Sequence, residues 1–408
     1  MTSKQIVILG AGFGGIAAAK QLVKYPEFEV TLIDQNPVHI IHGQLYEVAT
    51  SPSELTSLPE LKRSVEIPLL EVFSGTAVKI ITARVESVNV LEQKVQAAGK
   101  SYRYDYLISA LGSSPNFFAI PGADEHSLHF QTSYDALRIR TAVETALDLA
   151  RLHTSLPVVN IIIAGGGVAG VEVAAELQGM LNYLSWQKNL SRNKIITTVI
   201  ERSSAIISTF PERVQVVAAK RLQDLGVEVK LNTVIESVDK HFVNTNQGNL
   251  KYDIFIWAAG VRANPLPTIE QFPIKKGDRI EVDSCFRPPS NQSIFILGDQ
   301  CSREDDNSGL PLPGTASQAI YQAKYVARAI RALAANQPLP KFQCQSFPYL
   351  IPLGPKWAIF ASGNRLIAGY FGYLIRQLVW LRYYSSILGL RKGLHWLWRT
   401  AEIYSRND

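Results

Sequence analysis

Glycines at fixed spacing are the residues of this chain whose chemistry is most evident. The pattern G-x-G-x-x-G occurs twice, as Gly10, Gly12 and Gly15, with Gly14 inside the first motif, and as Gly165, Gly167 and Gly170. In this motif the first glycine turns the chain, the second lets backbone approach a pyrophosphate, and the third packs a helix against its strand. Free N–H groups at the start of that helix bind the phosphates. Each motif therefore predicts a dinucleotide site.

The sequence around both motifs supports this interpretation. Each follows an apolar, β-branched run, residues 5–9 in the first case and 160–164 in the second, and each leads into Ala-rich sequence typical of a helix. The two motifs start 155 residues apart, so they belong to separate strand–turn–helix units. One such motif is a weak signal, whereas two in the same context rarely arise by chance. Two dinucleotides in one chain predict that electrons pass between them.

An acidic residue follows each motif at the end of the next predicted strand. Asp34 follows residues 28–33 and lies 19 residues after Gly15, near the usual spacing of about 20. Glu201 follows residues 195–200 and lies 31 residues after Gly170, because a polar segment around residues 182–193 intervenes. A carboxylate in this position binds ribose hydroxyls. The alternative is that both are solvated acids at strand ends.

Two near copies of another strand close the two halves. Residues 104–112 and 252–260 both run from Tyr-Asp through apolar residues into a glycine, Gly112 and Gly260 respectively. The chain therefore contains an internal duplication of dinucleotide-binding halves. A later apolar run ends in Gly298 and Asp299, and a helix is predicted from Ala316 to about Ala334. Thr315 with Gln318 three residues on matches a capping box, which would fix the start of that helix.

These patterns predict an α/β protein with two Rossmann-like dinucleotide-binding domains and a C-terminal segment. The first domain is split in sequence, over residues 1–120 and 271–340, and the second covers residues 121–270. The remaining segment, residues 341–408, is predicted to contain strands and then two apolar helices divided near Gly389. A chain of 408 residues has ample length for two or three such domains.

The positive charge of the chain is concentrated near its C-terminus. The formal net charge is +6, and from Ile320 onward there are 12 Lys and Arg against two acidic residues, so the rest of the chain is net negative. No run reaches the roughly 20 apolar residues that span a bilayer, and no secretory signal precedes the first strand at Gln5. The three cysteines form no C-x-x-C motif, which excludes the dithiol flavoprotein reductases.

The C-terminal segment combines its basic residues with many Trp and Tyr side chains. In its last helix, an apolar face is predicted from the spacing of Leu394, Leu397, Trp398 and Ala401. Basic and aromatic residues at a terminus favour attachment to a membrane surface over binding of nucleic acid. The alternatives are a helix docked on the protein's own core and a homodimer interface.

Together, these features resemble the type II NADH:quinone oxidoreductases, single-subunit flavoenzymes of the respiratory chain. The resemblance covers essentially the whole chain and implies FAD at the first motif, NADH at the second, and two-electron reduction of a membrane quinone without proton pumping. It also implies a peripheral protein on the cytoplasmic face of the cell membrane. The cofactor-binding residues assigned in this way are Gly10, Gly12, Gly14, Gly15, Asp34, Gly112, Gly165, Gly167, Gly170, Glu201, Gly260, Gly298, Asp299, Ala316 and Gln318.

The resemblance also implies two catalytic residues. Glu172 matches a family glutamate near flavin and quinone, where a carboxylate relays protons; the alternatives are an acid that only complements the helix dipole, and Glu176 in its place. The late helix lines the quinone pocket in the family and usually carries three glutamines. Here Ser317 and Tyr321 replace two of them and Gln322 remains, which indicates a specialised quinone.

Two rival functions share parts of this pattern. A sulfide:quinone oxidoreductase has the same architecture but requires a cysteine pair beside the flavin, for which Cys285 and Cys344 would have to converge. An NADH-sensing flavoprotein, similar to relatives of apoptosis-inducing factor, would form a long-lived reduced complex instead of turning over. Glu201 predicts a preference for NADH over NADPH, although neighbouring Arg202 favours the 2′-phosphate.

Overall fold

The computed structural model describes residues 3–152, 159–270, 272–289, 291–306 and 308–406. The chain divides into two compact units. Unit 1 comprises Met1–His39, Ile67–Ser114 and Val261–Phe347, and unit 2 comprises Ile40–Glu66, Pro115–Gly260 and Pro348–Asp408. The C-terminal segment, predicted to be separate from residue 341, thus belongs from Pro348 onward to the same unit as the second glycine motif, whereas residues 341–347 belong to unit 1.

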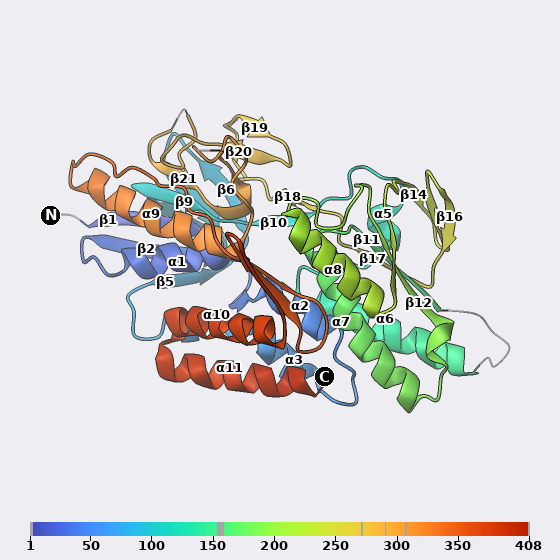
Figure 1. Ribbon diagram of the computed structural model, residues 1–408. Coiled ribbons are helices and arrows are strands. Elements are labelled where there is room, and N and C mark those ends of the chain that lie inside the picture. The colour runs from blue at the N-terminus through green and yellow to red at the C-terminus, as the bar shows by residue number, and fades with distance from the viewer. Residues whose placement is uncertain (1–2, 153–158, 271, 290, 307, 407–408) are drawn as a thin grey trace. The chain divides into compact units, whose positions relative to one another are not determined.

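A five-stranded parallel sheet forms the core of unit 1 (Figure 1). Its strands are adjacent in the order β21 (Ile294–Ile296), β9 (Tyr106–Ser109), β1 (Lys4–Leu9), β2 (Phe28–Asp34) and β5 (Lys79–Thr82). Strand β1 is a continuous apolar run because both faces of a parallel sheet are covered, and Ile6, Ile8 and Leu9 have no exposed surface. Helix α1 (Phe13–Leu22) follows β1 and packs against α9 (Ala316–Ala334).

Smaller elements complete unit 1. Two three-stranded sheets are present, one of β6 (Val85–Asn89), β7 (Lys94–Ala97) and β8 (Lys100–Arg103), the other of β19 (Ile274–Lys275), β20 (Arg279–Glu281) and β22 (Cys301–Ser302). Short helices are α4 (Leu69–Val72) and the 3₁₀ turn η3 (Gly298–Gln300). Strands β3 (Val38–Ile40), β4 (Glu66–Pro68), β10 (Ser113–Pro115) and β18 (Val261–Ala263) lie where the chain passes between the units.

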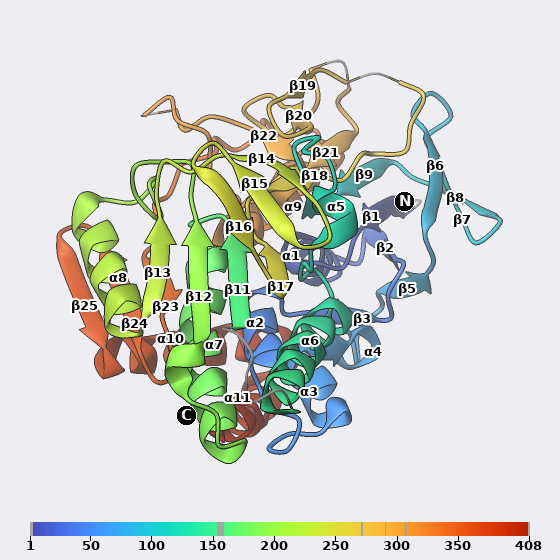
Figure 2. The same cartoon turned by 90° about the vertical axis from the view of Figure 1, so that its right-hand side faces the viewer.

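Unit 2 is built on a four-stranded parallel sheet. Its order is β13 (Val227–Lys230), β12 (Ile195–Ile200), β11 (Val159–Ala164) and β17 (Ile254–Trp257), and Figure 2 shows the first three side by side. Its connecting elements are α5 (Ala123–His126), α6 (Ser133–Leu152), α7 (Val168–Gln187), η2 (Arg192–Lys194) and α8 (Glu212–Asp224). An antiparallel sheet is formed by β14 (Ile235–Val238), β15 (Phe242–Thr245) and β16 (Gly248–Lys251).

The strand registers confirm the predicted internal duplication. In unit 1, β1 pairs in parallel with β2 on one side and β9 on the other, and in unit 2, β11 pairs in the same way with β12 and β17. The final pairs before the glycine motifs, Leu9 with Ile33 and Ala164 with Ile200, are equivalent. Each motif therefore leaves its sheet at the carboxyl edge, next to the strand that ends in an acid.

The C-terminal segment of unit 2 contains three strands and two helices. The antiparallel strands are β23 (Tyr349–Pro352), β24 (Ala358–Ser362) and β25 (Arg365–Gly369), and the helices are α10 (Tyr370–Leu388) and α11 (Leu390–Ser405). Helix α10 packs on β24, and α11 packs on α10 and on α3 (Leu58–Val65); α2 (Leu45–Ala49) and the 3₁₀ turn η1 (His42–Gln44) precede α3. None of the helices in the described part of the chain is long and apolar enough to cross a bilayer.

Candidate functional site

The first glycine motif forms a tight loop between β1 and α1. Gly10 has a φ of +94°, and a Cβ atom there would lie 2.3 Å from the carbonyl oxygen of Ala110, just beyond β9. A Cβ atom on Gly15 would lie 1.8 Å from the carbonyl oxygen of Gly10, so α1 approaches the loop too closely for a larger residue. Gly12 instead faces open space, with no atom within 4 Å of a Cβ atom placed on it. The open side of the loop fits a pyrophosphate.

The second motif repeats this geometry. Gly165 has a φ of +100°, and its Cβ atom would lie 2.6 Å from the carbonyl oxygen of Ala258, just beyond β17. A Cβ atom on Gly170 would lie 1.9 Å from the carbonyl oxygen of Gly165, whereas Gly167 again has no atom within 4 Å. Each of the three glycines in a motif is thus required for a different structural reason. Only the middle glycine leaves room for a ligand.

The acids predicted at the strand ends occupy equivalent positions in the two units. Asp34 accepts a hydrogen bond of 2.6 Å from the backbone N–H of Ala11, and Glu201 accepts one of 2.7 Å from Gly166, the corresponding residue of the second motif. Each carboxylate also accepts a 2.7 Å bond from the backbone N–H two residues further on. Both carboxylates are therefore held against their motifs, where the ribose of a bound nucleotide would lie.

The long spacing before Glu201 has a different cause from the one predicted. Helix α1 has 10 residues, whereas α7 has 20 and continues to Gln187, through much of the segment that the sequence assigned to a polar insertion. The extra residues lengthen the helix and leave the strand register unchanged, so Glu201 reaches the same place as Asp34.

The glycines that follow β9 and β17 lie at the same sheet edge as the motifs. Gly112 comes two residues after Ala110, the contact of Gly10, and Gly260 comes two residues after Ala258, the contact of Gly165. The carbonyl of Gly112 accepts a 2.9 Å bond from the N–H of Asn264. Their predicted role in cofactor binding stays a prediction.

Asp299 and Gln322 are connected through the 3₁₀ turn η3. Asp299, in η3, accepts a 2.7 Å hydrogen bond from the hydroxyl of Ser113. The side chain of Gln322 is buried, and its Oε1 accepts a 2.8 Å bond from the backbone N–H of Gly298. Gln322 therefore holds the turn that positions Asp299, and its amide oxygen is engaged within unit 1. The catalytic role assigned to Gln322 remains a prediction, and Glu172 lies in the other unit.

The start of α9 contains a buried amide without a protein partner. The Thr315 side chain accepts a 3.3 Å bond from the N–H of Gln318, as predicted for a cap at Ala316. The return bond of a capping box is absent, because Oε1 and Nε2 of Gln318 have no hydrogen-bond partner among the described residues although the residue is 1 % exposed. Buried amides are normally paired, so an unpaired one beside a helix N-terminus fits a polar ligand such as the flavin ring.

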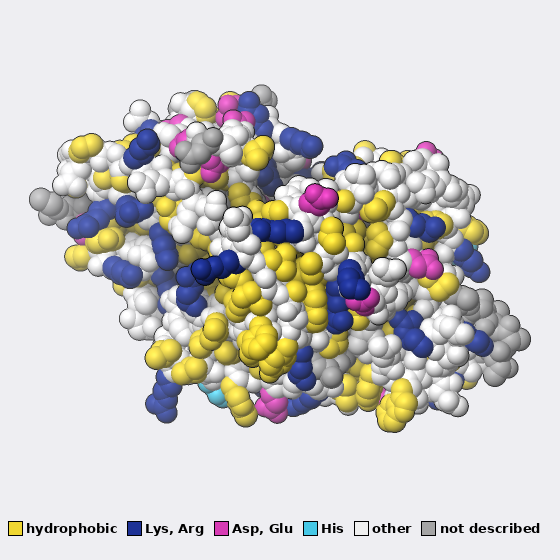
Figure 3. Space-filling model, in the orientation of Figure 1, with side chains coloured by type: hydrophobic (Ala, Val, Ile, Leu, Met, Phe, Trp, Pro, Cys, Tyr) yellow, Lys and Arg dark blue, Asp and Glu magenta, His cyan; other side chains and the backbone are white. Residues whose placement is uncertain are grey.

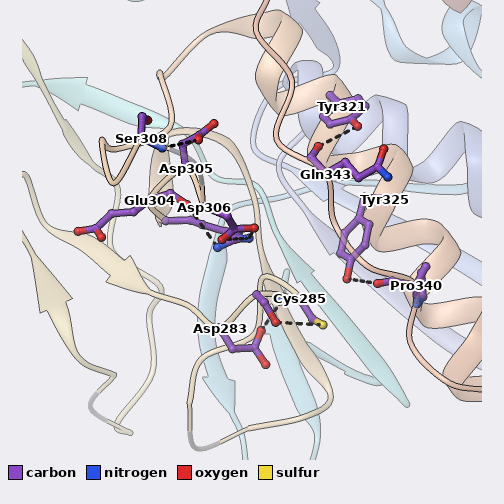
Figure 4. A network of polar contacts seen from close by, with 12 residues as sticks. Asp283, Cys285, Glu304, Asp305, Asp306, Ser308, Tyr321, Tyr325, Pro340 and Gln343 are labelled. Carbon is purple, nitrogen blue, oxygen red and sulfur yellow. Dashed lines mark hydrogen bonds and ion pairs between the residues drawn. The ribbon is translucent and has the colours of Figure 1, made fainter.

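Tyr321 and Tyr325 of α9 bind the chain that follows this helix. Their hydroxyls donate hydrogen bonds to the carbonyls of Gln343 at 2.9 Å and Pro340 at 2.8 Å, so Tyr321, which replaces an expected glutamine, is engaged with protein (Figure 4). Figure 4 also shows Cys285, whose sulfur is 3.8 Å from the Ser284 hydroxyl. All three cysteines are free thiols.

A buried charge cluster in unit 2 joins α2 and α10. The guanidinium of Arg376 lies 3.0 Å from Oε1 of Glu47, donates to the hydroxyl of Tyr46, and lies over that ring at 5.5 Å. Arg376 is 3 % exposed and Glu47 is 7 % exposed. A cavity of about 10 Å³, lined in part by Glu47, Arg376 and Glu176, adjoins the pair. An ion pair removed from water in this way is sensitive to the loss of either partner.

Glu172 belongs electrostatically to this cluster. Removal from bulk water raises the pKa of Glu172 to about 8; the negative charge of Glu47 acts in the same direction, and Arg376 opposes both. The raised pKa favours the protonated form of this carboxyl group at neutral pH. Glu176, one turn further along α7, is buried, whereas Glu172 is partly exposed.

Glu47 and Arg376 are not among the site residues predicted from the sequence. The available signal was an arginine inside the aromatic, apolar stretch Tyr370–Leu388, since a charged residue in such a helix is usually paired.

The fold and the two motifs define a pyridine-nucleotide-dependent oxidoreductase. The sequence matches the pyridine nucleotide-disulphide oxidoreductase family over residues 4–323, and the chain belongs to this family. It is 28 % identical over 391 residues to the type II NADH:quinone oxidoreductase of Haemophilus influenzae, covering 89 % of this chain and 88 % of that protein.

Two further proteins are similar over nearly the whole chain. Demethylphylloquinone reductase NdbB of Synechocystis is 27 % identical over 419 residues, covering 99 % of this chain and 98 % of that protein. The structure of NDH2 from Plasmodium falciparum in complex with NADH has a TM-score of 0.85, with 19 % identity and 99 % of each chain covered. The sequence matches confirm the predicted resemblance to the type II NADH:quinone oxidoreductases, and the structural match supports the fold.

Proposed function

We propose that this protein is an FAD-dependent NADH:quinone oxidoreductase. The observation that carries the proposal is the presence of two complete dinucleotide-binding loops, each with an open middle glycine and a strand-end carboxylate bound to the loop. One loop in each unit gives the chain places for an electron donor and for a resident redox cofactor. The relatives with printed activities, NADH:quinone oxidoreductases and a demethylphylloquinone reductase, supply the acceptor class.

FAD fits unit 1 on the chemistry of its residues. In this proposal Asp34 would bind the adenosine ribose, the open loop at Gly12 the pyrophosphate, and Asp299 the ribityl or phosphate region, which the contacts of Asp34 with the loop and of Asp299 with Ser113 support. Gln318 offers an unpaired donor and an unpaired acceptor at the start of α9, the pattern that the polar edge of a flavin ring requires. When bound, FAD supplies a ring that accepts a hydride and gives up two electrons.

NADH fits unit 2. Glu201 is held beside the second motif and presents a carboxylate where the 2′-hydroxyl of the adenosine ribose would lie. A 2′-phosphate in this place would meet that negative charge, so we propose that Glu201 selects NADH against NADPH. Arg202 follows Glu201 in the chain and is the residue with the opposite preference.

We propose that the protein contributes to quinone reduction through a proton on the carboxyl group of Glu172. A quinone takes up two protons with its two electrons, and the raised pKa of Glu172 favours its protonated form at neutral pH. Burial is the main cause of the raised pKa of Glu172; Arg376 on α10 lowers this pKa, and Glu47 on α2 raises it. We propose that Glu172 gives up this proton to the reduced quinone, with Glu176 as the buried carboxyl group one turn behind it.

We further propose that α10 and α11 attach the protein to a membrane surface on the cytoplasmic side of the cell membrane. Large apolar side chains on these helices are exposed, and Figure 3 shows hydrophobic side chains gathered over α10, with Lys and Arg around them. The exposed residues include Phe371, Leu378, Leu394 and Trp398. Buried apolar area and basic side chains together give surface binding without crossing.

Truncation before Tyr370 is a poor test of attachment, because it removes Arg376 and leaves Glu47 buried without its counter-ion. The better variant is Phe371→Ser, Leu378→Ser, Trp398→Ser, which changes exposed side chains only. In a flotation assay with anionic liposomes, this variant should remain in the unbound fraction. Its activity with long-tailed quinones should fall more than its activity with short-chain quinones. Equal flotation of variant and wild type would contradict attachment, and sedimentation then tests the alternative, a homodimer through this face.

Each of the two rival functions predicts a feature that distinguishes it from the proposed function. A sulfide:quinone oxidoreductase needs a redox-active cysteine pair, whereas the three cysteines are free and Cys285 and Cys301 are buried. An NADH-sensing flavoprotein would hold its reduced complex for a long time.

Anaerobic reduction with NADH, followed by mixing with a panel of benzoquinones and naphthoquinones, tests the proposed activity. Rapid reoxidation by any lipid quinone supports it and ranks the acceptors. Reduced flavin that persists with every quinone would contradict it.

A further inference from the structure

A second polar groove lies on unit 2 between α3 and α11. It has a volume of about 200 Å³ and is lined by Glu60, Arg63, Arg399, Glu402, Ile403 and Arg406. Neither glycine motif nor the charge cluster around Arg376 contributes to this lining. The proposed electron transfer therefore gives the groove no role.

The charged side chains that line the groove differ in how many ion pairs they form. Arg406 serves both acids, with Nη1 3.3 Å from Oε1 of Glu60 and Nη2 3.3 Å from Oε1 of Glu402. Glu60 also accepts a 2.9 Å bond from the N–H of Ser57 at the start of α3. Arg406 is shared by the two glutamates and offsets one of their two negative charges, and with three arginines against two glutamates the lining has a net charge of +1.

Arg63 and Arg399 are the other two arginines of the lining. Arg399 donates a hydrogen bond to the backbone carbonyl of Arg63 and lies 5.0 Å over the ring of Trp396, which fixes its direction. The Arg63 side chain is exposed and makes no hydrogen bond or ion pair with the residues that the structure describes. Two guanidinium groups at one groove form a fork that matches a phosphate.

An exposed apolar row leads into this groove. Leu394 and Trp398 on α11 are 47 % and 66 % exposed, and Glu402 and Arg406 continue the same row at intervals of four residues. Each step along the row is about one helical turn, or roughly 5.4 Å. A molecule with an apolar chain beside Trp398 would therefore place a polar end over the groove within one or two turns.

We propose that this groove binds the phosphate group of an anionic phospholipid, with the acyl chains lying along Leu394 and Trp398. The inference rests on the proposed membrane attachment and adds to it a specific headgroup site. Arginine recognises phosphate through paired N–H donors, and a negatively charged headgroup matches the excess charge of the lining. The adjoining apolar row favours a lipid over a free anion.

The test compares two variants that lose the same charge from the same helix. Arg63→Gln removes a lining residue, whereas Lys62→Gln removes an exposed neighbour that does not line the groove. Binding of the full-length protein to phosphatidylcholine vesicles containing phosphatidylglycerol should weaken about tenfold in Arg63→Gln. Lys62→Gln should weaken it no more than about fivefold, the usual effect of one surface charge. Equal weakening in both variants would overturn the site and leave only diffuse attraction.

Two soluble probes separate the possible sources of the phosphate. Monomeric short-chain phosphatidylglycerol should bind wild type in calorimetry and bind Arg63→Gln much more weakly, and inorganic phosphate should bind both weakly. Inorganic phosphate that binds as well as the lipid and depends equally on Arg63 would identify a soluble-anion site and overturn the lipid. Failure of the intact protein to float with any vesicle would contradict membrane attachment, while the short-chain lipid would still decide the groove.

Discussion

Units 1 and 2 differ in what surrounds the same nucleotide-binding loop. In unit 1 the neighbouring side chains are amides: Gln322 holds the turn before Asp299, and Gln318 is buried without a protein partner. In unit 2 a buried cluster that acts on α7, the helix after the second motif, contains charges, with Arg376 paired to Glu47 and both acting on Glu172. Neutral donors and acceptors suit a cofactor that stays bound, whereas a protonated carboxyl group suits a step that consumes protons. The shared backbone therefore provides binding, and the added side chains divide the chemistry.

The largest expected effects come from the equivalent middle glycines. Gly12 and Gly167 have φ values of −75° and −74° and face open space, so Leu is tolerated by the backbone at both positions. Gly12→Leu should yield folded protein without flavin. Gly167→Leu should keep its flavin and bind NADH about two orders of magnitude more weakly. Flavin absorbance and NADH titration measure both outcomes, and a Gly12→Leu protein with full flavin would show that FAD binds elsewhere.

Loss of the buried arginine should be the next largest effect. Arg376→Met leaves the Glu47 carboxylate buried without its counter-ion, which costs about 3–5 kcal/mol of stability. Arg382→Met, on the exposed side of the same helix, should cost less than about 0.5 kcal/mol. Urea unfolding of both variants measures the difference. The double variant Glu47→Gln, Arg376→Met should recover part of the loss, and no recovery would argue against the pair.

The variant Glu172→Gln tests whether a protonated carboxyl group in unit 2 controls the pH dependence of quinone reduction. In wild type, flavin reoxidation by quinone should slow as pH rises through about 8, because Glu172 then loses its proton. The variant should be about 100-fold slower and lack this pH dependence, while flavin reduction by NADH changes little. An unchanged profile would assign the proton to another group.

The free energy of unfolding should also depend on the protonation of Glu172, and it should fall as pH rises. The folded protein keeps the Glu172 proton to about pH 8, whereas an unfolded chain loses it near pH 4.3. The folded state therefore binds more protons between these values, and stability falls as pH rises through this window. Glu172→Gln should flatten this dependence in urea unfolding at pH 6 and 8.

The smallest effect is expected at the second strand-end acid. Glu201→Gln should narrow the preference for NADH over NADPH about tenfold in kcat/KM, because the repulsion of the 2′-phosphate is removed. Glu236→Gln, which removes an exposed acid of the same unit, is the matched control. A wild-type enzyme that prefers NADPH would refute the role of Glu201.

Local patterns carried most of what the sequence could predict. The glycine motifs, their acids, the duplicated strands and the bounds of α9 depend on residues close together in the chain or on repeated strand geometry, and the structure agrees with them. Strand β25 was missed, although Gly363 and Asn364 between Ser362 and Arg365 are typical of a tight hairpin. The predicted apolar stripe of α11 is exposed at Leu394 and Trp398.

Long-range charge pairing was beyond sequence reasoning. Glu47 and Arg376 are 329 positions apart, and neither has a spacing pattern that identifies its partner. The sequence also did not reveal that only half of the capping box at Gln318 forms. Thr315 followed by Gln318 reads the same whether the Gln318 amide returns a bond to Thr315 or is left without a protein partner. The grouping of the C-terminal segment with unit 2 depends on the packing of α11 on α3, of β23 on α7 and of β24 on α8, which propensity does not reveal.

The pairing of Glu47 with Arg376 also limits when this protein can finish folding during synthesis. Unit 2 is assembled from three stretches of chain, the last of which starts at Pro348. On the ribosome, Glu47 emerges early and stays without its counter-ion until α10 has been made, so unit 2 cannot reach its final charge balance while the chain is growing. Domains usually fold as units as they emerge. Here we expect unit 2 to remain open to chaperones until α10 and α11 have left the ribosome.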